Sequence, residues 1–273
     1  MTSRVTKLDY YADMWRLVSQ STVVSFLEVS RFPFLRPLRN PRKPADDDGR
    51  SALVLDSTIF HPQGGGQPAD MGFITVEGDD REVKFAVQDV RLKDGLVYHY
   101  GHVEDLAEGG VVEFEEGKEV HLHVDEPRRK LNSRLHSAGH LLDVCMKRVG
   151  LGLEPGKGYH FPNGPFVEYK GVIPPSEISN KQKELETEAN ALISKGEEVS
   201  AAILPYDEAL EQCGGSLPDY IPKESTPRIV KLGSNPGCPC GGTHVHNLSE
   251  IISMKVSQIR VKKGVTKVSY TVV

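Results

Sequence analysis

Cysteine and tryptophan are scarce in this sequence, which has four of the former and one of the latter among 273 residues. Four cysteines spread over a chain this long, with no secretory signal, favour reduced thiols or metal ligands over a disulfide framework. No run approaches the roughly 20 apolar residues of a membrane span, and the N-terminal segment MTSRVTKLDYYADMW has no apolar signal core. We therefore expect a cytosolic (cytoplasmic) protein without a membrane partner.

An excess of positive charge is also missing, because 33 Lys and Arg face 38 Asp and Glu and give a net charge of −5. A protein that coats nucleic acid needs clustered basic side chains, so any RNA contact must be local. The P-loop pattern GxxxxGK[ST] is absent as well. The length of 273 residues favours two domains over one.

The first half of the chain has the pattern of a β structure. Short apolar segments separated by Gly, Asp and Asn occur at intervals that suit a small barrel. One segment, residues 31–50, interrupts them with four prolines and six basic residues. It reads either as an exposed insertion without a role or as an RNA contact. The predicted strands cover residues 21–29, 52–55, 72–76, 83–90, 97–103 and 120–124.

The pattern changes to a helical one near residue 125. Asp125 can cap a helix that begins at Pro127 and ends at Val149, before Gly150. Further helices are expected over 176–195 and 206–212, and a hairpin over 251–273. The fold class is thus α+β, with an N-terminal small β-barrel domain over 1-125 and an α+β domain over 126-273.

His136 and His140 are four residues apart in the predicted helix, so both rings lie on one face, one turn apart. This spacing allows two imidazoles to share a metal ion. The face lies opposite the apolar stripe of Leu131, Leu135 and Leu142, so we expect the histidines outside the core. Taken alone, the pair fits a solvated surface equally well.

A second pair, Cys240 and His244, lies on a glycine-rich turn whose Gly241 and Gly242 let both side chains converge. One thiolate with three imidazoles suits tetrahedral Zn²⁺. Cys238 offers another thiol, but Cys240 has the better spacing to His244. A structural zinc is the alternative, since four protein ligands close the coordination shell.

Two further segments are rich in turn residues. The first, Phe60–Asp70, contains three successive glycines, which let a backbone approach a bound group closely, although a plain turn explains them too. The second, Gly156–Tyr169, mixes turn residues with aromatics and would otherwise be a turn before a strand.

Taken in order, these four motifs resemble the editing domain of alanyl-tRNA synthetases and its free-standing relatives, the AlaX proteins of medium length. The HxxxH and CxxxH pairs are shared with threonyl-tRNA synthetase editing domains. The resemblance implies a translation-factor-like barrel that carries the glycine motif, followed by a zinc-binding tRNA editing domain. The motifs are Phe60–Asp70, His136–His140, Gly156–Tyr169 and Cys240–His244.

The implied function is hydrolysis of the ester in tRNA(Ala) mischarged with serine, chiefly, and with glycine. No aminoacylation domain is expected, so the protein would act in trans, without ATP. The cofactor would be Zn2+. The resemblance places the metal and the catalytic site at His136, His140, Cys240 and His244. It places substrate binding at Gly65, Gly66, Gln67, Lys157 and Gly158.

Three positions depart from the family pattern. Gly139 stands where synthetase editing domains often have Thr, Gly156 where a glutamine is expected, and Tyr270 where relatives commonly have Arg. Contacts to the substrate would therefore be missing there, and the amino-acid preference stays open.

Two other functions compete with editing. A structural-zinc module could bind RNA without hydrolysing anything. A zinc peptidase is disfavoured, because Ser137 stands where HExxH supplies a glutamate base. For RNA contact the sequence favours local basic groups, and it does not define the oligomeric state. These groups are Arg128, Arg129, Lys130, Arg134, Lys262 and Lys263.

Overall fold

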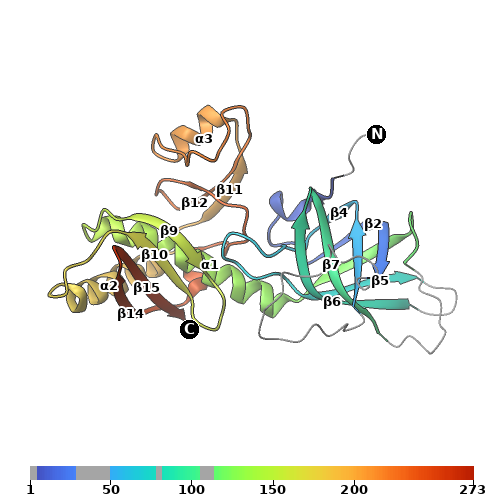
Figure 1. The fold of residues 1–273 in the computed structure, drawn as a ribbon, viewed down its shortest axis with the longest axis horizontal. Helices are drawn as coiled ribbons and strands as arrows, with labels where there is room; N and C mark the ends of the chain where they lie inside the picture. The colour runs from blue at the N-terminus through green and yellow to red at the C-terminus, as the bar shows by residue number, and fades with distance from the viewer. Residues whose placement is uncertain (1–4, 29–49, 78–81, 105–113) are drawn as a thin grey trace. The chain divides into compact units, whose positions relative to one another are not determined.

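The computed structural model describes residues 5–28, 50–77, 82–104 and 114–273. The chain divides into two compact units (Figure 1). Unit 1 comprises Met1–Gln63 and Ala69–Arg129, and unit 2 comprises Gly64–Pro68 and Lys130–Val273. The centre of the glycine motif thus groups with unit 2, while the domain ranges 1-125 and 126-273 stay a prediction. The 31–50 segment, apart from Arg50, lies outside the described residues.

Unit 1 contains a closed barrel in the order β2-β3-β7-β6-β5-β8, which agrees with the predicted small barrel. A short parallel pair, β1 (Lys7–Leu8) with β4 (Ser57–Thr58), accompanies it. All six barrel segments coincide with predicted strands. Their bounds are β2 Val18–Glu28, β3 Ser51–Leu55, β5 Gly72–Glu77, β6 Glu82–Lys93, β7 Leu96–Val103 and β8 Glu119–Val124.

The strand pattern in β6 shows why these residues form a barrel. Val83, Phe85 and Val87 are buried at alternate positions, as expected for a strand with one face inward. The next buried side chain is Val90, three residues further on, because the register with β7 shifts before Asp89. A bulge of this kind bends a strand, as closure of a small barrel requires.

Unit 2 has one four-stranded sheet, β14-β15-β10-β9, and one three-stranded sheet, β11-β12-β13. Together with the barrel and three α-helices among the described residues, they confirm an α+β protein. None of the described helices has the length and apolarity needed to cross a membrane. The helices are α1 Glu126–Arg148, α2 Ile178–Lys195 and α3 Tyr206–Gln212. The strands are β9 Glu154–Tyr159, β10 Phe166–Lys170, β11 Val199–Ile203, β12 Arg228–Leu232, β13 Cys238–Pro239, β14 Met254–Lys262 and β15 Val265–Val272.

Helix α1 is buried on two sides within unit 2, because much of its polar face is covered as well as its apolar stripe. Leu135 and Leu142 join Val167 and Tyr169 of β10 in the apolar core, as the stripe predicts. In contrast, the side chain of Leu131 is 37% exposed, whereas that of His136 is 1% exposed. The alternative of a solvated surface pair is therefore wrong for His136, whereas His140 is partly exposed. The ring of His136 is covered by Gly242 of the glycine-rich turn and by Gln67 of the Gly64–Pro68 segment, and both are far from α1 in the sequence.

Arg129 is not available for RNA, which corrects a second expectation. Its side chain is 3% exposed, and its guanidinium lies 2.6 Å from the carboxylate of Asp70, which is 0% exposed. The guanidinium also donates to the backbone carbonyls of Met14 and Ile59 at 2.8 and 2.6 Å. A buried cation requires such partners, so Arg129 serves the interior of unit 1.

The other basic groups differ in exposure. Arg134 is partly buried and donates to the Ile251 carbonyl at 2.9 Å. Arg128 is also partly buried and donates to the Ala69 carbonyl at 3.0 Å. Lys130, Lys262 and Lys263 are exposed, and their contact with RNA stays a prediction.

Candidate metal centre

Four side chains of unit 2 form a cluster that could hold a metal ion. Their ligand atoms lie within 4.8 Å of one another, and they come from His136, His140, Cys240 and His244. The two helical histidines are one turn apart on α1, whereas the other two follow β13 on the glycine-rich turn. Gly242 is required there, because a Cβ would collide with the ring of His136.

The three imidazoles present the same nitrogen, Nε2, to the centre of the cluster. Nε2 of His136 and Nε2 of His140 are 3.2 Å apart. Sγ of Cys240 lies 3.3 Å from Nε2 of His244 and 3.6 Å from Nε2 of His136. One sulfur and three imidazole nitrogens form a donor set that suits zinc.

The electrostatics of Cys240 also fit a metal ligand. Burial raises the pKa of its thiol, and the backbone N–H of Gly242, 3.3 Å from Sγ, opposes this effect. A buried thiol that is costly to ionise on its own becomes a thiolate when a metal cation binds beside it. The residues present therefore fit the expected group.

Behind the cluster, Gln67 fixes the ring of His136. Its Oε1 lies 2.6 Å from Nδ1 of His136 and also accepts the backbone N–H of Thr243 at 3.0 Å. Its Nε2 donates to the Thr243 hydroxyl, which bonds the hydroxyl of Ser133, each at 2.8 Å. A hydrogen bond to Nδ1 leaves Nε2 free for a metal, so this network selects the binding tautomer.

The other two imidazoles are oriented in the same manner. Nδ1 of His244 lies 3.1 Å from the hydroxyl of Ser137, and Nδ1 of His140 lies 3.0 Å from Sγ of Cys238. Cys238 thus contacts the nitrogen of His140 that points away from the cluster. Of the two neighbouring thiols, only that of Cys240 belongs to the group of candidate ligands.

A cavity of about 330 Å³ opens beside the cluster within unit 2. His136, His140 and Cys240 line it, whereas His244 does not. Asp143 lines it too, and the hydroxyl of Tyr169 donates to its Oδ1 at 2.7 Å. Burial raises the pKa of Asp143 to about 7, against the opposing effect of this hydrogen bond. The cavity therefore combines candidate metal ligands with one carboxyl group.

His160 is a cavity residue that the sequence reasoning missed. Its ring stacks on that of His136, with the centroids 4.7 Å apart, and its Nδ1 lies 2.7 Å from the hydroxyl of Tyr270. Burial lowers the pKa of His160 to about 3, and the charge of His140 acts in the same direction. The only signal for His160 in the sequence was its place within Gly156–Tyr169.

The five predicted substrate residues occupy different places. Gly65 and Gly158 line the cavity. Gly66 packs against the backbone of Gly158, since a Cβ there would lie 2.5 Å from the Gly158 oxygen. Gln67 is buried behind His136, and Lys157 is exposed and is not among the residues that line the cavity.

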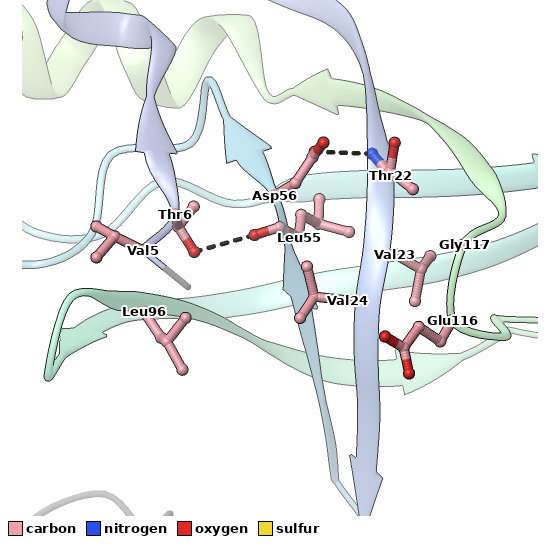
Figure 2. Close-up of a pocket in the computed structure, with 10 residues that line it drawn as sticks. All are labelled: Val5, Thr6, Thr22, Val23, Val24, Leu55, Asp56, Leu96, Glu116 and Gly117. Carbon is pink, nitrogen blue, oxygen red and sulfur yellow. Dashed lines mark hydrogen bonds between the residues drawn. The ribbon is translucent and has the colours of Figure 1, made fainter. Parts of the chain in front are cut away.

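A separate cavity of about 280 Å³ belongs to unit 1. Figure 2 shows Thr6 bonded to the carbonyl of Leu55, and the N–H of Thr22 bonded to Asp56, along its wall. It contains none of the predicted site residues.

Two compact units, one with a barrel and one with a cluster of three histidines and a cysteine, define an α+β protein with a candidate metal centre. The family described as tRNA synthetases class II (A) matches residues 40–128. The alanyl-tRNA editing protein AlaX-L of Pyrococcus horikoshii is 31% identical over 246 residues, which are 88% of this chain and 56% of that protein. The chain is thus homologous to AlaX-L over most of its own length.

Alanine–tRNA ligases match the same chain. The ligase of Methanosarcina acetivorans is 31% identical over 224 residues, or 80% of this chain and 23% of the ligase. That of Halobacterium salinarum is 32% identical over 236 residues, or 84% of this chain and 23% of the ligase. The chain thus spans about half the length of AlaX-L and a quarter or less of the ligases.

Proposed function

We propose that the protein is a zinc-dependent aminoacyl-tRNA deacylase that acts in trans on tRNA(Ala) mischarged with serine, chiefly, and with glycine. The observation that carries this proposal is the cavity of about 330 Å³ whose wall contains three of the four candidate metal ligands. A reacting group in this cavity would be adjacent to the metal. The similarity to AlaX-L, an alanyl-tRNA editing protein, supports the same reaction.

His136, His140, Cys240 and His244 would hold the zinc ion. When bound, zinc supplies a Lewis acid for the ester carbonyl or for the attacking water. The protein orients the ligands through Gln67, Ser137 and Cys238, each bonded to the outer nitrogen of one imidazole. Such outer contacts raise both ligand basicity and metal affinity.

Asp143 would bind the α-ammonium group of the esterified amino acid. Its Oδ1 is occupied by the Tyr169 hydroxyl, the one hydrogen-bond partner of its carboxylate among the described residues, so Oδ2 is left for a ligand. A carboxyl that burial keeps at a raised pKa becomes fully ionised once a cation lies beside it. This pairing would select aminoacyl esters over acyl groups that lack the amine.

The test is deacylation of tRNA(Ala) charged with serine, glycine or alanine, without ATP, by zinc-loaded protein and by protein treated with a chelator. We expect rapid release of serine, slower release of glycine, little release of alanine, and loss of all activity without zinc. Zinc-loaded protein that binds the charged tRNA but releases no amino acid would instead support a structural-zinc RNA-binding module.

A further inference from the structure

Three glycines surround the ring of His160. A Cβ at Gly139 would collide with Cε1 of the ring, and one at Gly158 would lie 2.5 Å from its Nε2. At Gly66 a Cβ would lie 3.1 Å from Cδ2, and the carbonyl of Gly66 accepts the backbone N–H of His160 at 2.8 Å. Glycines from three separate segments, Gly66, Gly139 and Gly158, therefore pack closely around one imidazole.

The hydrogen bonds of Tyr270 define the tautomer of this imidazole. The Tyr270 hydroxyl donates its single hydrogen to the carbonyl of Leu135 at 2.8 Å, because a carbonyl can only accept. The same hydroxyl lies 2.7 Å from Nδ1 of His160, so it must accept a hydrogen from Nδ1. The neutral ring therefore carries its proton on Nδ1 and a lone pair on Nε2.

Nε2 of His160 has no hydrogen-bond partner among the described residues, although the side chain is only 5% exposed. It is also not one of the fully enclosed polar atoms without a partner, so it is open to the cavity that His160 lines. A nearly buried acceptor without a partner costs free energy until a ligand satisfies it. The ring contacts that of His136, which places this acceptor next to the candidate metal centre.

We propose that Nε2 of His160 accepts a hydrogen bond from the side-chain hydroxyl of the seryl group, which makes His160 the residue that distinguishes serine from alanine. This inference rests on the proposed function. Serine can donate to this nitrogen, whereas the methyl group of alanine cannot. A site that bonds a hydroxyl rejects an analogue that lacks it far more strongly than an apolar pocket can.

Two substitutions of His160 distinguish a role in recognising the seryl hydroxyl from a role in packing. The amide of asparagine reaches as far as Nδ1, so His160→Asn keeps the contact with Tyr270 and removes the acceptor in the cavity. The amide of glutamine reaches as far as Nε2, so His160→Gln keeps an acceptor there. Tyr159→Phe is the control in the same segment, since it removes only an exposed hydrogen bond to Asn163.

The experiment measures kcat/KM of zinc-loaded protein on seryl-, glycyl- and alanyl-tRNA(Ala). It also measures binding of seryl and alanyl amides of 3′-amino-3′-deoxyadenosine, which cannot be hydrolysed as esters. We expect His160→Asn to lower the ratio of seryl to glycyl kcat/KM about 100-fold and to abolish the preference for the seryl amide. His160→Gln should keep a measurable part of both preferences, and Tyr159→Phe should keep all of both.

An unchanged preference for the seryl amide in folded His160→Asn protein that contains zinc would overturn the proposal. If His160→Asn does not fold, the test compares His160→Leu, which has no acceptor, with His160→Gln, which keeps one. An equal preference for the seryl amide in these two variants would overturn the proposal. If the wild-type protein releases no amino acid from any tRNA, the proposed function fails, and the amide-binding comparison still decides the role of His160.

Discussion

Nδ1 of His136 lies 2.6 Å from Oε1 of Gln67, a residue 69 positions earlier in the chain. The side chain of Gln67 is completely buried, and its amide also bonds Thr243 of the glycine-rich turn. We predicted Gln67 as a substrate-binding residue, but its neighbours are a candidate ligand and the turn that holds two others. The geometry favours a role in positioning the metal ligands.

Gln67→Ala should therefore lower zinc affinity by about 10- to 100-fold, the usual effect of removing a hydrogen bond to the outer nitrogen of a ligating histidine. Competition with a chromogenic chelator measures this affinity. Gln63→Ala is the matched control, because the side chain of Gln63 is exposed and only its backbone bonds, to Val90. Equal affinities of the Gln67 variant and the wild type would refute the positioning role.

Cys240→Ala should remove most of the zinc, since it deletes the thiolate that faces the three Nε2 atoms. Cys238→Ala should leave close to one zinc per chain at saturating metal, with a weaker affinity, because His140 loses the partner of its Nδ1. Metal analysis after dialysis gives the stoichiometry. An empty site in Cys238→Ala together with a full one in Cys240→Ala would reverse the ligand assignment.

Arg129→Ala should destabilise the protein by about 3–5 kcal/mol, because it leaves the carboxylate of Asp70 buried without its cation. Arg128→Ala should cost less than about 1 kcal/mol, since Arg128 is partly exposed and donates one side-chain bond, to Ala69. Chemical denaturation of both variants measures the difference. Similar losses for the two would contradict the assignment of Arg129 to the interior.

The sequence predicted elements well where one local signal dominates. The helix over 206–212 was predicted with its observed ends, and α1 begins and ends within one residue of the prediction. The stripe on α1 correctly placed Leu135 in the core. Helical periodicity could not show that the opposite face is also covered, because the segments that cover His136 are distant in the sequence. For the same reason the partner of Arg129 had no sequence signal, and the only signal for His160 was its place within Gly156–Tyr169.

The glycine motif offers a matched pair of substitutions. A Cβ at Gly65 meets nothing within 4 Å, whereas one at Gly66 lies 2.5 Å from the backbone oxygen of Gly158. Both residues have positive φ, so each alanine variant bears a similar strain of about 1 kcal/mol. Gly66→Ala should additionally displace Gly158 and the ring of His160, and should reduce seryl-tRNA deacylation more strongly than Gly65→Ala. Equal activities would show that the close approach at Gly66 is unimportant.

The raised pKa of Asp143 predicts that the stability of the protein depends on pH. Its pKa in the folded protein is raised to about 7 from 3.8, so the folded state binds the proton more tightly than the unfolded state. Its effect on stability is therefore smallest below pH 4, where both states are protonated, and becomes unfavourable as pH rises through 7. Asp143→Asn removes this penalty, which is of order 2 kcal/mol once the partial exposure of the carboxyl is considered.

Thermal unfolding of the two proteins without metal at pH 5 and pH 8.5 tests this sign. Asp143→Asn should be more stable than the wild type by a larger margin at pH 8.5, while the titration of the histidine and cysteine ligands cancels in the difference. The same variant should bind the seryl amide more weakly at pH 7, where most of the α-amine is still protonated, because it has lost the partner proposed for the α-ammonium group. A carboxyl retained for stability would give the opposite pattern, with Asp143→Asn less stable at pH 8.5 and equal in binding.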